Sequence, residues 1–297
     1  MTVHTLDLKF LNQDETIAAF LLDTYEGPVL IETGPYSTFP QLEQALSEHG
    51  WSTSDVRHVF LTHIHFDHAG AAWALAESGA TIYVHPAGAP HLSDPSKLVN
   101  SASRIYGDDM ERLWSTIRPI NPDHIHETAD GETIQVGNLH VKSWHTPGHA
   151  SHHIAWQVGA ALFAGDVAGV KIGEGPVVPP CPPPDINIEL WKQSIEVIRN
   201  IEGLKQIYLT HFGPVTALKP HLDQLEIQLN NWAGWILEQF KDGKTAKEVT
   251  PLFMEYAASQ LRTFGLNDAQ ILQYEYANPA WMSVAGLMRY WKKKLAL

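Results

Sequence analysis

The stretch Leu-Thr-His-Ile-His-Phe-Asp-His-Ala-Gly, residues 61–70, places four potential metal ligands within six positions. It closes an apolar run over residues 57–61 that predicts a buried strand, and it leads into a helix expected over residues 69–77. A strand that ends in a loop can direct all four side chains toward one place. The stretch therefore predicts a metal site at the end of a strand.

The spacing of these four side chains indicates more than one ion. His63 and His65 are two positions apart, so they project to the same side of an extended backbone. Asp67 and His68 are expected in the following turn, just before the helix. Since four alternating donors cannot all serve one tetrahedral ion without strain, we expect two neighbouring divalent ions. Imidazole and carboxylate donors suit zinc, and they also fit manganese or iron.

Three other predicted strand ends carry residues of the same kind. His149 follows a Thr-Pro-Gly turn, Asp166 follows a strand expected over residues 161–164, and His211 completes a second Leu-Thr-His that repeats residues 61–63. Each position alone is weak evidence, because a His or Asp at a strand end is usually a surface residue. Together, in this order along the chain, they indicate one shared site.

The first two thirds of the chain alternate predicted strands and helices, which is typical of an α/β fold. Strands are expected over residues 3–10, 17–22, 29–31, 57–61, 81–84, 133–136, 139–144, 153–158, 161–164 and 206–209. Helices are expected over residues 39–49, 69–77 and 189–200. Residues 85–122 are expected to form a helical excursion, and the proline-rich loop 176–184 can be neither helix nor central strand.

The last part of the chain predicts helices only. Apolar residues recur at helical spacing over residues 218–240, and capping boxes at Thr245 and Asn267 open two further helices. A proline at the expected start of the last helix agrees with this interpretation. We therefore expect two domains, residues 1–216 and residues 217–297.

Composition excludes several classes of function. The net charge of −13 has the wrong sign for a surface that binds nucleic acid. The longest apolar run, residues 69–76, is too short for a membrane span, and the start of the chain lacks a basic-then-apolar signal. Cys181, the single cysteine, cannot form an internal disulfide. We expect a soluble cytoplasmic protein without nucleic-acid or membrane partners; its oligomeric state is not predicted.

The complete ligand pattern closely resembles the metal signature of the metallo-β-lactamase superfamily. That pattern comprises His63, His65, Asp67, His68, His149, Asp166 and His211. The resemblance covers about residues 1–216 and implies an αββα sandwich, here followed by an all-helical C-terminal subdomain. It implies that His63, His65 and His149 hold one ion. It implies that Asp67, His68 and His211 hold the second, with Asp166 bridging both.

The resemblance is strongest to the glyoxalase II and lactonase branches of that superfamily. It implies a metallohydrolase that cleaves a small thioester, ester or lactone through attack of a metal-bridging hydroxide on the carbonyl. Asp67 is expected to orient the nucleophile and return a proton to the leaving group. The alternative is a mononuclear non-haem iron persulfide dioxygenase, in which His63, His149 and Asp166 form the iron triad. A non-catalytic metal-binding module is a third hypothesis.

The expected substrate is a small, uncharged or apolar carbonyl compound. Glutathione carries two carboxylates that need cations near the site, yet the loop region 167–188 offers only Lys171. Walls of the cleft are expected from the excursion at 85–122 and from residues 177–184, with the helical tail beside them. We expect residues 177–184 to wall the cleft without supporting the metal ligands, and Cys181 to have no nucleophilic role.

Overall fold

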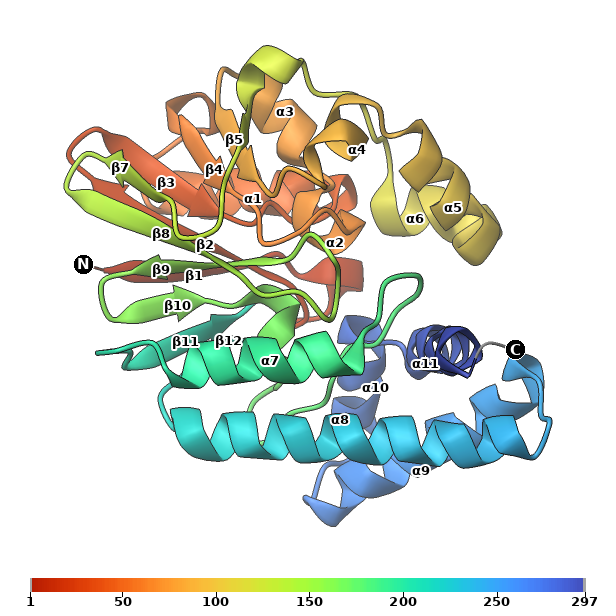
Figure 1. The fold of residues 1–297 in the computed structure, drawn as a ribbon. Coiled ribbons are helices and arrows are strands. Elements are labelled where there is room, and N and C mark those ends of the chain that lie inside the picture. Colours follow the sequence, from red (N-terminus) through yellow and green to blue (C-terminus); the bar gives the residue numbers. More distant parts are fainter. Residues whose placement is uncertain (1, 296–297) are drawn as a thin grey trace.

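The computed structural model describes residues 2–295, which form two six-stranded sheets stacked face to face (Figure 1). In the first sheet the strands follow their order in the chain, and β3 to β6 run parallel to one another. Its strands are β1 (Val3–Asp7), β2 (Ala18–Thr24), β3 (Gly27–Ile31), β4 (His58–Phe60), β5 (Thr81–Val84) and β6 (Ile125–Glu127).

The second sheet has the order β12-β11-β10-β9-β8-β7, in which only β10 and β11 are parallel neighbours. Its strands are β7 (Thr133–Val136), β8 (Leu139–His145), β9 (Ile154–Val158), β10 (Ala161–Phe163), β11 (Gln206–Leu209) and β12 (Gly213–Val215). The carboxyl ends of β4, β10 and β11 point to the same end of the sandwich, where they hold the candidate site.

Helices cover the outer face of each sheet (Figure 1). On the first sheet lie α1 (Phe39–Glu48), α2 (Phe66–Ala69), α3 (Ala72–Glu77), α4 (Ala89–Ser93), α5 (Ser96–Tyr106) and α6 (Met110–Trp114). On the side of the second sheet lie α7 (Ile188–Arg199), α8 (Leu218–Lys241), α9 (Ala246–Thr263), α10 (Asp268–Ala277) and α11 (Ala280–Lys294). Helix α8 packs against α7, and α9 and α11 pack against α8. This arrangement confirms the predicted αββα sandwich with a helical C-terminal region.

Strand β2 contributes side chains to two separate apolar cores, one on each of its faces. Phe20 and Leu22 point between the sheets, where they pack with Trp156. Ala19 and Leu21 point the other way, into the core under the helices of the first sheet. Since successive side chains of a strand face opposite sides, a strand buried on both faces is apolar throughout.

Among the differences from the sequence-based prediction are two short strands, one helix boundary and the end of β1, which stops at Asp7 and not at Phe10. Strands β6 and β12 were not predicted, because each spans three residues and β12 contains Pro214. The helix expected over residues 69–77 begins at Phe66 and is divided into α2 and α3. A Cβ atom at Gly70 would lie 2.4 Å from the Phe66 carbonyl oxygen, so only glycine lets the chain pass here.

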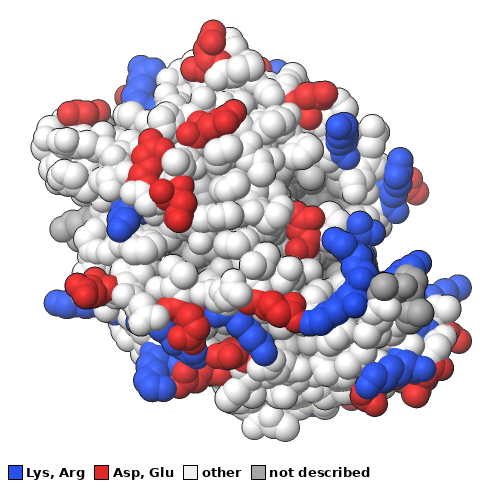
Figure 2. Space-filling model, viewed as in Figure 1, with Lys and Arg blue, Asp and Glu red and all other residues white. Residues whose placement is uncertain are grey.

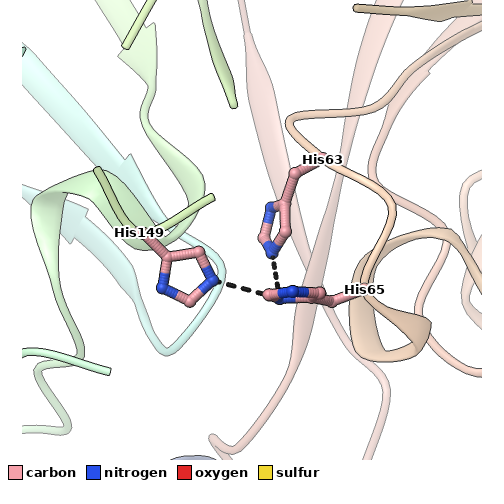
Figure 3. Close-up of side chains that lie close together, drawn as sticks. All are labelled: His63, His65 and His149. Carbon is pink, nitrogen blue, oxygen red and sulfur yellow. Dashed lines mark hydrogen bonds between the residues drawn. The ribbon is translucent and has the colours of Figure 1, made fainter. Parts of the chain in front are cut away.

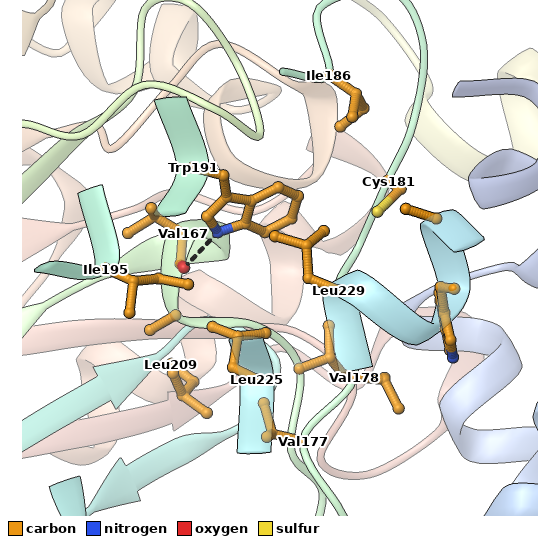
Figure 4. Close-up of a cluster of buried hydrophobic side chains, with 14 of the residues drawn as sticks. Val167, Val177, Val178, Cys181, Ile186, Trp191, Ile195, Leu209, Leu225 and Leu229 are labelled. Atoms are coloured by element: carbon orange, nitrogen blue, oxygen red, sulfur yellow. Dashed lines mark hydrogen bonds between the residues drawn. The ribbon is translucent and has the colours of Figure 1, made fainter. Parts of the chain in front are cut away.

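The helical tail packs against α7 through α8 and shares the apolar core of the second sheet. Trp191 of α7 and Leu225 of α8 belong to one apolar cluster, which also contains Val177 and Cys181 (Figure 4). The predicted boundary at residue 216 falls between β12 and α8; independent folding of the two parts stays a prediction. Among the described residues, no helix combines the length and apolar character needed to cross a membrane.

Candidate metal centre

The structure brings all seven predicted ligands together at one end of the sandwich. They arise from the segments that follow β4, β8, β10 and β11. Three groups have ligand atoms within 4.8 Å of one another: His63, His65 and His149; His63, His68 and Asp166; and Asp67, His68 and His211. Asp67 and His68 lie in the short helix α2, which corrects the prediction of a turn. His65 and Asp67 are half-buried, whereas the other five are buried.

The first group is made of three imidazoles (Figure 3). His65 Nδ1 lies 2.9 Å from His63 Nε2 and 3.1 Å from His149 Nε2. All three nitrogens therefore converge on one point, although they come from two different sheets. Three convergent imidazole nitrogens are a ligand set that zinc and other first-row divalent ions accept.

The second group consists of Asp67, His68 and His211, and Asp166 joins it to the first. Asp166 Oδ2 lies 3.3 Å from His149 Nε2, while Asp166 Oδ1 lies 3.4 Å from His68 Nε2 and 3.5 Å from His211 Nε2. Asp67 Oδ2 lies 3.5 Å from His211 Nε2. The two oxygens of one buried carboxylate thus face two separate sets of imidazoles.

Two of these atoms lack hydrogen-bond partners among the described residues. They are His68 Nε2 and Asp166 Oδ1, and both are buried. Burying a polar atom without a partner is costly, and such atoms in native proteins mark a missing water or ion. The donor set and these orphaned atoms fit divalent cations.

In four of the imidazoles, the Nδ1 atom faces away from the centre and lies beside a hydrogen-bond acceptor. The Nδ1–H of His149 donates to the Pro180 carbonyl at 2.8 Å, and that of His211 donates to the Thr16 carbonyl at 2.7 Å. His63 Nδ1 lies 3.0 Å from the Thr62 hydroxyl. A partner behind Nδ1 leaves Nε2 free to face the centre and fixes the ring, as outer partners of metal-binding histidines do.

Glu32 is the acceptor behind His68, and sequence reasoning missed it. Its carboxylate is fully buried, lies 3.2 Å from His68 Nδ1, and accepts hydrogen bonds from the hydroxyls of Thr62 and Thr210. The backbone of Glu32 has φ +64°, a conformation unusual for this residue type. The available signal was a lone carboxylate at the end of a strand, directly before a Thr-Gly-Pro turn.

The two groups differ in their affinity for protons. Burial, reinforced by the neighbouring imidazoles, lowers the pKa of His63 well below its usual value and that of His65 to about 4. Burial also acts on His68 and His211, but nearby carboxylates, chiefly Asp166, outweigh it and raise both pKa values. The first group is therefore neutral at pH 7, whereas the second holds protons that a metal ion would displace.

Two histidines that follow His149 in the chain, His152 and His153, lie close to the site. The ring of His153 lies 5.1 Å from that of His63, and its Nδ1 lies 2.9 Å from the Thr146 hydroxyl. His152 lies 6.2 Å from the same ring. The His153 ring therefore packs beside that of His63.

The proline-rich loop supports the ligands, contrary to the prediction that it only walls the cleft. The Pro180 carbonyl holds His149, and Val177 is fully buried in the core. Cys181 points into the same core, where burial raises the pKa of its thiol, an environment that disfavours a nucleophilic thiolate. Its backbone N–H donates to the Ser283 hydroxyl at 3.2 Å, and a Cβ atom at Gly286 would lie 2.0 Å from its carbonyl oxygen.

A cavity of about 470 Å³ opens beside the half-buried ligands. Three parts of the chain line it next to His65, Asp67, Asp166 and His211: the residues after β1, helices α5 and α6, and the segment from Glu275 to Met282. Pro180, Pro182 and Pro183 complete the lining. The predicted walls therefore surround the site, and the volume suits a small molecule.

Comparison with known proteins defines the class to which this fold and site belong. The model of the metallo-beta-lactamase superfamily matches residues 14–211, and the chain belongs to that superfamily. It is 30% identical over 184 residues to a metallo-beta-lactamase fold-containing protein, ST1585, of Sulfurisphaera tokodaii; the match covers 58% of this chain and 69% of the relative.

Two further similarities concern function and architecture. The chain is 28% identical over 152 residues to a hydroxyacylglutathione hydrolase of a Methylobacterium species, and this match spans 50% of the chain but only 45% of the relative. The solved structure of a metallo-beta-lactamase family protein from Thermus thermophilus, TTHA1429, aligns with 99% of this chain and 94% of its own at 20% identity and a TM-score of 0.73. That likeness concerns the fold alone, but it includes the helical tail.

Proposed function

We propose that this protein is a dinuclear metallohydrolase of small ester, thioester or lactone substrates, with zinc as its metal. The single observation that carries the proposal is the Asp166 carboxylate, whose two oxygens face two separate groups of imidazoles. A site for one ion would need three or four ligands, whereas seven side chains meet here. Relatives named as hydroxyacylglutathione hydrolases support hydrolysis as the reaction class.

Bound divalent ions would supply a lowered pKa for a water molecule and polarisation of a substrate carbonyl. The residues of the chain position these components. His63, His65 and His149 would hold the first ion; Asp67, His68 and His211 would hold the second, with Asp166 between them.

Asp67 has a further part in the proposed reaction. It is half-buried, lines the cavity and lies beside His211. Burial alone would raise the pKa of its carboxyl group, but His68 and His211 lower it to about 2, so the group is ionised at pH 7. An ionised carboxylate at the cavity wall can orient a water molecule and accept its proton, to be returned to the leaving group.

Metal analysis combined with a substrate panel tests this proposal. Gently purified protein should contain close to two zinc ions per chain and should hydrolyse members of a panel of thioesters, esters and lactones. Chelation should abolish this activity, and zinc should restore it. One iron per chain with oxygen uptake on a persulfide would instead support the dioxygenase, and activity confined to a phosphodiester would contradict a carbonyl substrate.

A further inference from the structure

The lining of the cavity beyond the metal centre is strongly apolar. The side chains that matter most come from α5, α6 and the start of α11. They are Leu98, Ala102, Tyr106, Trp114, Trp281 and Met282. Removal of an apolar surface from water is favourable, and a substrate bound at the reaction centre can cover this surface.

Charged groups in this lining do not suit an anionic carrier. Within the part of the chain that the structure describes, Arg112 is the cation of the lining, and its Nε lies 3.0 Å from the Asp109 carboxylate. Glu275 adds a second carboxylate and accepts a hydrogen bond from the Ala280 N–H at 3.1 Å. A carrier with two carboxylates, such as glutathione, would meet more negative than positive charge here.

Aromatic side chains connect the two walls across the cavity. The rings of Tyr106 and Trp114 lie 5.2 Å apart on the α5–α6 side, and Tyr106 lies 5.9 Å from Trp281 of α11. Trp114 also stacks on Phe10 at 5.7 Å. Tyr106 and Trp281 line the same cavity as Asp67, so the aromatic pair and the candidate metal centre face one space.

We propose that this cavity binds an apolar acyl group of about six to ten carbons, laid along the surface that Tyr106 and Trp281 form together, as the determinant of substrate choice. The inference rests on the proposed hydrolytic function for its catalytic outcome, but acyl binding itself requires only the cavity. A volume of about 470 Å³ accommodates such a group together with the carbonyl at the metal centre. Specificity then resides in the acyl group and does not depend on the leaving group.

Matched substitutions on α5 test this inference. Ser101 and Ser103 are both exposed, but Ser101 lines the cavity and Ser103 does not. With a 4-nitrophenyl ester series from acetate to decanoate, KM of the metal-loaded protein should fall about three- to fourfold per added methylene. Ser101→Trp should remove this dependence by filling the cavity, and Ser103→Trp should preserve it.

Substitution of Trp281 tests the opposite wall. Trp281→Ala should raise KM for the decanoate ester about tenfold, because the acyl chain loses one of its two aromatic neighbours, while the metal content stays unchanged. Phe264→Ala, which removes an aromatic ring that is 49% exposed and lies outside the lining, should leave the series unchanged. Equal profiles for Trp281→Ala and Phe264→Ala would overturn the assignment.

Binding of inert ketones separates this inference from the proposed function. Calorimetric titration with 2-pentanone to 2-decanone measures chain recognition without hydrolysis. If no ester is hydrolysed but affinity rises with chain length and Ser101→Trp removes the rise, the acyl site stands and the hydrolytic proposal fails. Hydrolysis that is independent of chain length, or confined to thioesters of anionic carriers, would overturn the acyl site while leaving hydrolysis intact.

Discussion

The tripeptide Leu-Thr-His occurs twice at the site, at residues 61–63 and 209–211, with opposite electrostatic results. Both copies end a strand with a parallel neighbour, and the hydroxyls of Thr62 and Thr210 both donate to Glu32. His63, however, lies among imidazoles that lower its pKa further, whereas carboxylates raise that of His211. The motif determines the position of each histidine, and the neighbouring side chains determine whether its pKa is lowered or raised.

Loss of the Asp166 carboxylate should have the largest effect, because its two oxygens face both groups of imidazoles. Asp166→Ala should empty both sites and lower kcat/KM by about a thousandfold, since Asp166 contacts imidazoles of both groups. Elemental analysis and kinetics provide the measurement, with the exposed Asp123→Ala as the control. Unchanged metal content would mean that Asp166 is not a ligand.

The second largest effect should be asymmetric. His211→Ala should lower the metal content from two ions to one, because His211 belongs only to the group with Asp67 and His68. His63→Ala should lower it further, because His63 belongs to two of the three groups. Cobalt substitution followed by absorption spectroscopy distinguishes the sites, and identical spectra for the two variants would contradict this division.

The shared contact of the two motifs gives a smaller expected effect. Glu32→Gln keeps an acceptor for the threonines but removes the charge behind His68, so the metal affinity of the second group should fall about 10- to 100-fold. Competition with a chelator measures this affinity. Thr210→Val, which removes one donor at 3.5 Å, should weaken it less. If Thr210→Val lowered the metal affinity more than Glu32→Gln, the charge of Glu32 would not be what supports His68.

Acidification should release the two ions in order. In the metal-free centre, His68 and His211 have raised pKa values and hold protons at higher pH, whereas His65 has a pKa of about 4. Protons therefore compete with metal at the second group at a higher pH than at the first. Metal content after dialysis at each pH should pass through a plateau near one ion, and simultaneous release of both ions would contradict the difference in proton affinity.

Sequence patterns predicted the ligands because each stands at the end of an apolar strand, where spacing and order are visible in the chain. Glu32 has no such pattern, since a single carboxylate after a strand is common on protein surfaces. The acceptor behind His149 is the backbone carbonyl of Pro180, which residue identity does not reveal. The pairing of Tyr106 with Trp281 depends on how the tail docks, and local periodicity does not specify docking.

The contact between α11 and the proline-rich loop restricts how this protein can be recombined with its relatives. Ser283 holds the N–H of Cys181, Gly286 allows α11 to touch the same residue, and the neighbouring Pro180 holds His149. A tail transplanted from another member of the superfamily would therefore alter the first metal group unless its helix also carried a hydroxyl and a glycine three positions apart. We therefore expect substitutions in α11 that reshape the cavity to alter metal binding through His149 as well, so directed evolution of one property should screen for the other.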